Sequence, residues 1–250
     1  MHPLGQTRTV IQPNHAFIAP DGHVPAALPG WTQTQGIILI SPRMRNIPRF
    51  TQYIAQMENG GTSGMPLAGV QRFAYMLEGR AELQVDGETI ALDSGKFAYI
   101  PADVAHTFSA TATTKLMIFE KPYTAPIASA TTPLEVVHGD AWAGDGDAFL
   151  GDENARLRVL LPTDTTYDMA VNLFTFQPGT ALPFAETHIM EHGLYLLEGQ
   201  GIYRLDDNWY PIQAGDVIWM GPYCPQWFCA IGRTQSTYIY YKDVNRDPFV

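Results

Sequence analysis

The feature that most constrains the fold of this chain is an internal repeat. Leu77-Glu78-Gly79 recurs as Leu197-Glu198-Gly199, and Gly95 recurs as Gly215, so both matches are displaced by 120 residues. A repeat of this length exceeds that of the usual short structural repeats. It therefore predicts two homologous domains in tandem rather than a solenoid.

The repeat also sets the predicted domain boundaries. We place the first domain at residues 1–130 and the second at 131–250. Residues 1–50 are punctuated by Pro and Gly, which predicts an arm of edge strands and loops before the first domain. Towards the end of the repeat we expect the displacement to grow by one residue, because Lys121 best matches Lys242.

Short apolar runs with turn signals between them predict strands. In the first copy they recur at near-even spacing, at residues 51–57, 71–77, 81–85, 89–92, 96–100 and 115–120. Asp86-Gly87 lies between two of these runs and is typical of a tight hairpin turn. The 22 Gly and 19 Pro argue against a helical protein. The sequence therefore predicts an all-β fold of sandwiches or barrels.

Charge and hydropathy exclude some classes of partner. The net charge is −10 with a pI near 5.0, which argues against nucleic acid because phosphate backbones need clustered Lys and Arg. No stretch of about 18 apolar residues is present, so we expect no membrane partner. Two cysteines are too few for a disulfide framework. We expect a soluble, cytoplasmic protein.

One stretch gathers two histidines and a carboxylate at a spacing that a metal could use. If Glu186, His188 and His192 lie on one strand, their even spacing places them on the same face. The turn at Gly221-Pro222 is expected to bring Gln226 beside them as a fourth ligand. The alternative is that these are ordinary core or surface residues. We favour a metal because desolvating two imidazoles and a carboxylate together is costly without a cation.

The first copy lacks this ligand set. In the first copy, Pro66 corresponds to Glu186, Ala68 to His188 and Arg72 to His192. His106 corresponds to Gln226. The first domain is therefore expected to be metal-free. A structural role is favoured, and a ligand-binding regulatory pocket is the alternative.

The two copies resemble a bicupin of the cupin superfamily, with a His-containing first motif that ends in Glu-Gly and a second motif that runs from Gly to Pro. The usual cupin ligands are permuted here to Glu186, His188, His192 and Gln226. With the turn at Asn208-Trp209 and the tail at 241–247, this pattern resembles the (S)-ureidoglycine aminohydrolase family. The resemblance implies two tandem jelly-roll barrels preceded by the N-terminal arm.

The resemblance also implies a function. Members hydrolyse (S)-ureidoglycine to (S)-ureidoglycolate and ammonia in purine catabolism, downstream of allantoin and allantoate, with manganese. It implies one Mn²⁺ per chain, in the second barrel only, held by Glu186, His188, His192 and Gln226. Lys242 and Glu186 are the implied catalytic residues, and the substrate contacts fall on Tyr203, Tyr238, Lys242 and Gln226. The expected partners are this small molecule and further copies of the chain in a homo-oligomer.

Two other classes of function remain open. A different bicupin metalloenzyme, such as a decarboxylase or dioxygenase, is expected to keep the His-rich ligand set, and Gln226 argues against it. A non-catalytic small-molecule-binding cupin has no need of four convergent ligands. From the residues alone, Tyr203 and Tyr238 could equally be core aromatics, and Lys242 could either pair with a carboxylate or move a proton.

Overall fold

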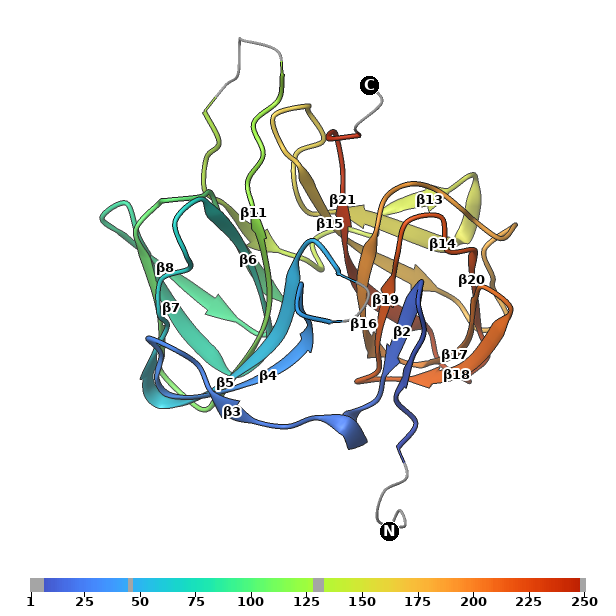
Figure 1. The fold of residues 1–250 in the computed structure, drawn as a ribbon, viewed down its shortest axis with the longest axis horizontal. Helices are drawn as coiled ribbons and strands as arrows, with labels where there is room; N and C mark the ends of the chain where they lie inside the picture. The colour runs from blue at the N-terminus through green and yellow to red at the C-terminus, as the bar shows by residue number, and fades with distance from the viewer. Residues whose placement is uncertain (1–6, 45–46, 128–132, 248–250) are drawn as a thin grey trace. The chain divides into compact units, whose positions relative to one another are not determined.

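The computed structural model describes the chain in three ranges, 7–44, 47–127 and 133–247. Within them nearly all regular structure is β, and the helical exception is a short 3-10 turn, η1, at Pro20–Gly22. Figure 1 shows the strands gathered into two groups, with β2 (His15–Ile18) from the start of the chain beside β19 (Val217–Met220) from its second half. The all-β prediction is therefore confirmed.

The chain folds into two compact units. The N-terminal barrel comprises residues 23–43 and 49–143, and the C-terminal barrel comprises residues 1–22, 44–48 and 144–250. These units differ from the predicted domains at 1–130 and 131–250. The boundary between the units lies later in the chain than predicted because β12 (Val137–Asp140) pairs with β9 (Lys96–Ile100) and so extends the sheet of the first barrel.

The N-terminal barrel is one continuous curved sheet. Its central element is the long strand β5, which pairs with β11 along its first half and with β10 at its far end. The remaining strands extend the sheet from these. With β9 and β12 given above, its strands are β3 (Ala26–Ala27), β4 (Thr32–Ile40), β5 (Thr51–Thr62), β6 (Val70–Glu78), β7 (Arg80–Val85), β8 (Glu88–Asp93), β10 (His106–Ala110) and β11 (Thr114–Pro122).

The C-terminal barrel is built from two sheets. An eight-stranded sheet runs in the order β1-β2-β19-β16-β21-β15-β14-β13, and a three-stranded sheet in the order β18-β17-β20. Consecutive strands β16 and β17 lie in different sheets, as in a jelly roll. The strands are β1 (Val10–Ile11), β2 (His15–Ile18), β13 (Asp147–Phe149), β14 (Asp152–Val159), β15 (Met169–Phe176), β16 (His192–Glu198), β17 (Gln200–Leu205), β18 (Asn208–Gln213), β19 (Val217–Met220), β20 (Gln226–Ala230) and β21 (Ser236–Asp243).

The predicted repeat is visible in the strand register. His106 pairs with Val85 in the first barrel, and Gln226 pairs with Leu205 in the second, so both members of the pair shift by 120. Across the repeat, Arg72 and His192 correspond in the same way, because they pair with Ile100 and Met220. The geometric equivalence of His106 and Gln226 is therefore confirmed.

The slip near the end of the repeat is two residues, not the predicted one. Arg72 lies opposite Glu120 on β11, whereas His192 lies opposite Lys242 on β21. Lys242 therefore corresponds to Glu120 and not to Lys121. The extra two residues lie in the β20–β21 turn, 231–235, which replaces the shorter turn at 111–113. An even slip preserves which face each side chain takes, whereas a slip of one would reverse it.

The repeated Leu-Glu-Gly motif marks the same backbone constraint in each barrel. Gly79 and Gly199 have positive φ angles of 87° and 83°. A Cβ atom would lie 2.2 Å from the carbonyl oxygen of Thr113 at the first and 2.4 Å from that of Gln235 at the second. Only glycine fits such a position, which explains why this part of the repeat stands out in the sequence.

The arm is divided between the barrels. The prediction grouped the whole of residues 1–50 with the first barrel, but β2 adds to the C-terminal barrel by pairing with β19, His15 opposite Met220. Arg8 fixes this segment through two hydrogen bonds to the carboxylate of Asp216, at 3.0 and 2.7 Å. β4 instead pairs with β5 in the N-terminal barrel. In the part of the chain that the structure describes, no helix is long and apolar enough to cross a membrane.

Candidate metal centre and active site

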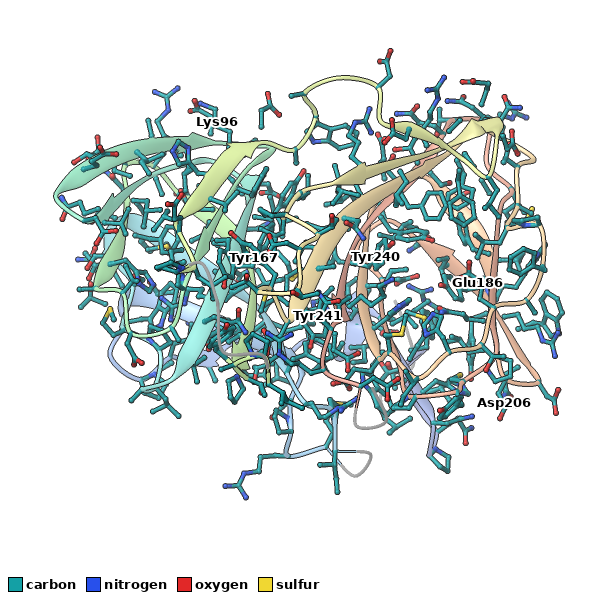
Figure 2. All side chains as sticks on the ribbon, turned by 90° about the horizontal axis from the view of Figure 1, so that it is seen from above. Lys96, Tyr167, Glu186, Asp206, Tyr240 and Tyr241 are labelled. Atoms are coloured by element: carbon teal, nitrogen blue, oxygen red, sulfur yellow. The ribbon has the colours of Figure 1, made fainter. Side chains whose placement is uncertain are left out.

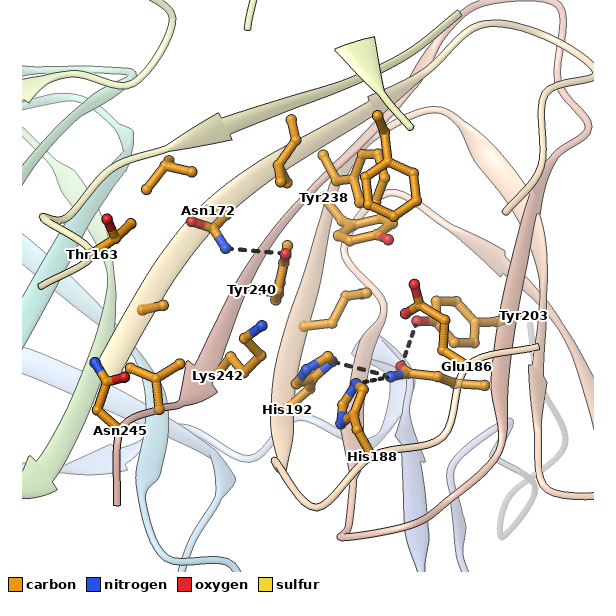
Figure 3. A pocket seen from close by; sticks show the side chains of 18 of the residues that line it. Thr163, Asn172, Glu186, His188, His192, Tyr203, Tyr238, Tyr240, Lys242 and Asn245 are labelled. Carbon is orange, nitrogen blue, oxygen red and sulfur yellow. Dashed lines mark hydrogen bonds between the residues drawn. The ribbon is translucent and has the colours of Figure 1, made fainter. Parts of the chain in front are cut away.

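The C-terminal barrel encloses a cavity of about 360 Å³. It is lined by all seven residues that the sequence singled out as ligands or substrate contacts: Glu186, His188, His192, Tyr203, Gln226, Tyr238 and Lys242. Figure 2 shows the side chains of Glu186 and Tyr240 within this barrel, and Figure 3 shows the cavity from close by. Residues that are up to 56 positions apart in the chain thus meet in one place.

Glu186 and Gln226 are brought together by their backbones. They form an isolated antiparallel bridge, in which each N–H donates to the other's carbonyl oxygen at 2.8 and 2.9 Å. Side chains directly opposite in such a pair project to the same side of the sheet. The bridge therefore sets the carboxylate beside the amide.

The expected strand through the three first-motif residues is absent. Glu186 and His188 lie in an irregular segment between β15 and β16, and only His192 lies in a strand, as the first residue of β16. The segment is held by its neighbours instead: Tyr223 donates its backbone N–H to the carbonyl of His188 at 2.7 Å. The residues converge as predicted, but loop anchoring and not strand alternation brings them together.

The two imidazoles face one amide. His188 and His192 have ring centroids 4.7 Å apart. The Gln226 amide lies 3.0 Å from Nε2 of His188 and 3.5 Å from Nδ1 of His192. Nδ1 of His188 donates to the carbonyl of Met190 at 3.0 Å, which leaves the lone pair on its Nε2 facing the cavity. A hydrogen bond of this kind is the usual way in which a metal-binding histidine is oriented.

His192 also fits a metal ligand. Its side chain is buried, and its Nε2 has no hydrogen-bond partner within the described residues. Burial, His188 and Lys242 all hold the pKa of His192 well below its usual value. Burial and Lys242 also lower the pKa of His188. Both imidazoles are therefore neutral at neutral pH, which is the form that coordinates a cation.

The fourth proposed donor, the carboxylate of Glu186, is less closely grouped than the two imidazoles and the Gln226 amide. Among the residues that the structure describes, no three His, Cys, Asp or Glu side chains are already gathered around one point. Each of the two imidazoles is within hydrogen-bond distance of the Gln226 amide, and Glu186 stands next to this amide through its backbone bridge to Gln226. Two nitrogens, a carboxylate and an amide oxygen are donors that suit a divalent first-row metal.

Lys242 lies opposite His192, on the neighbouring strand β21. Burial lowers its pKa, while the charge of Glu186 opposes this shift. Burial raises the pKa of Glu186, and Lys242 opposes that shift in turn. Each side chain thus opposes the effect that burial has on the pKa of the other. Lys242 therefore releases a proton more readily than an exposed lysine does.

The two predicted tyrosines are buried in the aromatic core and also reach the cavity. Tyr203 and Tyr238 are only 2% and 4% exposed and belong to the same apolar cluster. The hydroxyl of Tyr203 donates to Oε1 of Gln226 at 3.2 Å, which orients the amide. Burial raises the pKa of both phenols well above the usual value, so both stay protonated. The two interpretations left open by the sequence, core aromatic and pocket residue, therefore both hold.

The lining residues that the sequence analysis missed include a hydrogen-bonded polar pair. Asn172 on β15 and Tyr240 on β21 line the same cavity, and the Asn172 amide donates to the Tyr240 hydroxyl at 3.0 Å. Tyr240 could have been found, because strand alternation puts it on the same face as Tyr238 and Lys242. Asn172 lies in a continuous apolar run, where a single polar residue gave no comparable signal.

The corresponding place in the N-terminal barrel is occupied by a guanidinium. Arg72, 1% exposed, donates to Glu120 at 2.7 Å and to the carbonyl of Gly64 at 2.9 Å. It also lies 3.0 Å from Nε2 of His106, whose Nδ1 bonds the carbonyl of Val104 at 2.8 Å. His106, the counterpart of Gln226, therefore faces Arg72.

Comparison with known proteins agrees with this architecture. A model of the cupin domain matches residues 53–120 and 172–239. The chain is 43% identical to the probable (S)-ureidoglycine aminohydrolase of Oryza sativa, over 98% of this chain and 78% of the relative. The Arabidopsis thaliana and Escherichia coli enzymes of that name are 42% and 33% identical, over 98% and 94% of this chain and 80% and 90% of their own lengths. The chain belongs to the (S)-ureidoglycine aminohydrolase family of cupin enzymes.

Solved structures extend the comparison. The putative glyoxylate-induced protein of Pseudomonas aeruginosa superimposes with a TM-score of 0.89 at 29% identity, covering 98% of this chain and 94% of that one. The protein Ylba of E. coli gives 0.82 at 30% identity and 96% coverage of both. Oxalate decarboxylase of Bacillus subtilis, at 0.68 and 12% identity over 98% of this chain and 80% of its own, shares the fold alone. The bicupin architecture of this aminohydrolase family member is thereby shown.

Proposed function

We propose that the protein catalyses the hydrolysis of (S)-ureidoglycine to (S)-ureidoglycolate and ammonia. The observation that carries this proposal is the set of seven side chains that meet in one cavity of a chain similar over its whole length to three (S)-ureidoglycine aminohydrolases. The step belongs to purine catabolism, downstream of allantoate. We further propose that it takes place in the cytoplasm and that the protein acts as a homo-oligomer.

We propose one Mn²⁺ per chain, bound in the C-terminal barrel. Glu186, His188, His192 and Gln226 would hold it, since their side chains line one cavity and the Gln226 amide lies 3.0 Å from Nε2 of His188 and 3.5 Å from Nδ1 of His192. When bound, a divalent cation is a Lewis acid that anchors and polarises the substrate. The Gln226 amide would turn its oxygen to the cation, and its NH₂ group would then donate to the Tyr203 hydroxyl oxygen in place of the bond that the amide oxygen accepts from Tyr203 here.

The chemistry requires orientation more than a strong nucleophile. The central carbon of ureidoglycine bears an amine, a ureido nitrogen and a carboxylate. The ureido nitrogen can push out ammonia to leave an acylimine, and water then adds to the same carbon to give ureidoglycolate. Water in and ammonia out balance the reaction. The enzyme has to hold the substrate so that water arrives on one face.

Lys242 is proposed to give its proton to the leaving amine. Burial lowers its pKa and favours proton release, and a divalent cation bound nearby would lower the pKa further. Glu186 is proposed to act as a ligand. Tyr203 and Tyr238 supply neutral hydroxyls to the substrate, and Tyr203 also fixes Gln226.

Two alternatives predict different results in the same assays. A decarboxylase or dioxygenase would act on a carboxylate substrate without releasing ammonia. A non-catalytic binding protein would hold a small molecule without turnover. The shared fold with oxalate decarboxylase does not favour the first, because the identity is only 12%.

The direct test is to incubate the manganese-loaded protein with freshly generated (S)-ureidoglycine. We expect ammonia release well above the spontaneous rate and a product of S configuration. Elemental analysis is expected to give one manganese per chain. Ammonia release no faster than the spontaneous rate would contradict the proposed function.

A further inference from the structure

A polar pair stands alone on an otherwise apolar wall of the cavity. Asn172 and Tyr240 face each other across β15 and β21, in register. Figure 3 shows their hydrogen bond, at some remove from the side chain of His188. The residues around them on this wall are Leu157, Val159, Ala170 and Phe174. Lys242 is in register with Ala170 at one end of this wall, but the stretch formed by Leu157, Asn172, Phe174 and Tyr240 carries no charged side chain, so it suits a neutral part of a ligand.

Asn172 has hydrogen-bonding capacity that the described residues leave unused. Its side chain is 5% exposed, and its Oδ1 has no partner among them. Its Nδ2 donates to the hydroxyl oxygen of Tyr240 at 3.0 Å. If the two amide atoms exchange places, one of them still lacks a partner. A buried amide atom without a partner is unfavourable, and such positions in native proteins have a specific cause.

The hydroxyl of Tyr240 is the second free group. Its oxygen accepts from Asn172, which leaves its proton available for a ligand. Burial raises the pKa of Tyr240 to about 12, so the proton is present at neutral pH. Its ring lies 5.3 Å from the ring of His192, which places the pair beside the proposed metal centre. The wall therefore offers one acceptor and one donor side by side.

We propose that Asn172 and Tyr240 form the subsite that recognises the terminal carbamoyl end of the substrate's ureido group. A urea carries N–H donors next to a carbonyl acceptor, which is the complement of the Asn172 oxygen and the Tyr240 hydroxyl. The terminal torsion of an asparagine is broad, so the amide can turn to meet the ligand. The substrate carboxylate, which the amide oxygen would repel, is left to Lys242 and the cation.

This inference rests on the proposed function but can fail separately from it. The probes are N-carbamoylglycine, which has the carboxylate and the ureido group but no leaving amine, and N-acetylglycine, in which a methyl group replaces the terminal NH₂. Neither releases ammonia by the proposed reaction. Titration calorimetry on the manganese-loaded full chain measures their binding without any turnover.

The wild-type protein is expected to bind N-carbamoylglycine at least about tenfold more tightly than N-acetylglycine, which is about 1.4 kcal/mol. Asn172→Leu, of similar size but without the acceptor, should reduce this ratio to about one and leave the affinity for N-acetylglycine unchanged. Asn172→Asp keeps an acceptor oxygen and should keep the ratio. Thr175→Val is the matched control: Thr175 lies on the other face of β15, where its hydroxyl bonds that of Thr237.

Several results would overturn the subsite. One is a wild-type ratio near one, or binding of neither compound. Another is a ratio that Asn172→Leu leaves unchanged, or that Thr175→Val lowers equally. A folded, manganese-loaded Asn172→Asp variant with a ratio near one would count against it as well, and this variant decides the case if Asn172→Leu does not fold. The ammonia assay on the wild type reports independently on the proposed function.

Discussion

The two barrels place side chains of different charge at equivalent positions. At equivalent positions the N-terminal barrel has Arg72 opposite Glu120, and the C-terminal barrel has His192 opposite Lys242. In the first barrel the Arg72 guanidinium is a permanent cation, which pairs with Glu120 and also donates to the carbonyl of Gly64. In the second barrel the basic residue of the pair is Lys242 on the opposite strand, and neutral imidazole nitrogens face the cavity.

The difference teaches what distinguishes a structural site from a reactive one in a duplicated fold. The Arg72 network is built around a charge that the protein itself carries, which supports the proposal that the N-terminal barrel binds no metal. The His192 site leaves a nitrogen without a partner within the described residues.

The largest effect is expected from removing both imidazoles. The double substitution His188→Ala and His192→Ala takes away two of the four proposed donors, so metal content and ammonia release should both fall to background. Elemental analysis and the steady-state ammonia assay measure this. His106→Ala in the other barrel is the matched control and should leave the metal content at one per chain. Unchanged metal in the double variant would show that the ion is bound elsewhere.

Lys242→Met should separate binding of the metal from turnover. Lys242 is outside the ligand set, so the variant is expected to keep its manganese. It should lose activity by about two orders of magnitude or more, because it removes a group that both orients the substrate and transfers a proton. Lys115→Met, at an exposed ion pair of the other barrel, is the control. Near-normal kinetics in Lys242→Met would make Lys242 a bystander.

Arg72→Met should affect stability and not chemistry. Removing one partner of a buried ion pair leaves Glu120 without its guanidinium, for which a loss of about 3–5 kcal/mol is typical. Denaturant unfolding gives this quantity. Arg80→Met breaks an ion pair with Asp93 that is exposed on both sides, and should cost much less stability. Equal losses in the two variants would remove the special place of Arg72.

His106→Gln is the smallest change and depends on pH. Burial, and to a lesser extent Arg72, lower the pKa of His106 below its usual value of 6.5. Below about pH 6.5 the unfolded chain therefore takes up the proton first, and the stability that His106 contributes is lost as the pH falls. The variant should cost about 1 kcal/mol at pH 7.5, with a smaller difference from wild type at pH 5.5. A difference that grows on acidification would mean that His106 is charged in the folded protein.

The parts of the fold that the sequence predicted correctly are those with local signals. Asp86-Gly87 forms the predicted hairpin turn between β7 and β8, with φ angles of 51° and 80°. The equivalence of His106 and Gln226 across the repeat follows from a constant displacement, which the local Leu-Glu-Gly motifs revealed. The contact between Arg72 and His106 followed from the same alignment.

The errors arose where the structure depends on distant pairing. Glu186 and His188 lie outside a strand because their segment is fastened to Gln226 and Tyr223, far along the chain. The slip of two residues came from turn length, which side-chain similarity between Lys121 and Lys242 concealed. The arm was misassigned in part because nothing in residues 15–18 states that β19 is their partner. Asn172 was missed because its unused oxygen can be recognised only in three dimensions.

The most direct test of the central claim, that the C-terminal barrel alone is catalytic, is a comparison of the equivalent residues His106 and Gln226. Manganese content and ammonia release are measured side by side for His106→Gln and Gln226→Ala. We expect the first variant to keep one manganese per chain and wild-type turnover, and the second to stay folded but lose metal affinity and activity. An inactive His106→Gln with an active Gln226→Ala would contradict the account and place the chemistry in the other barrel.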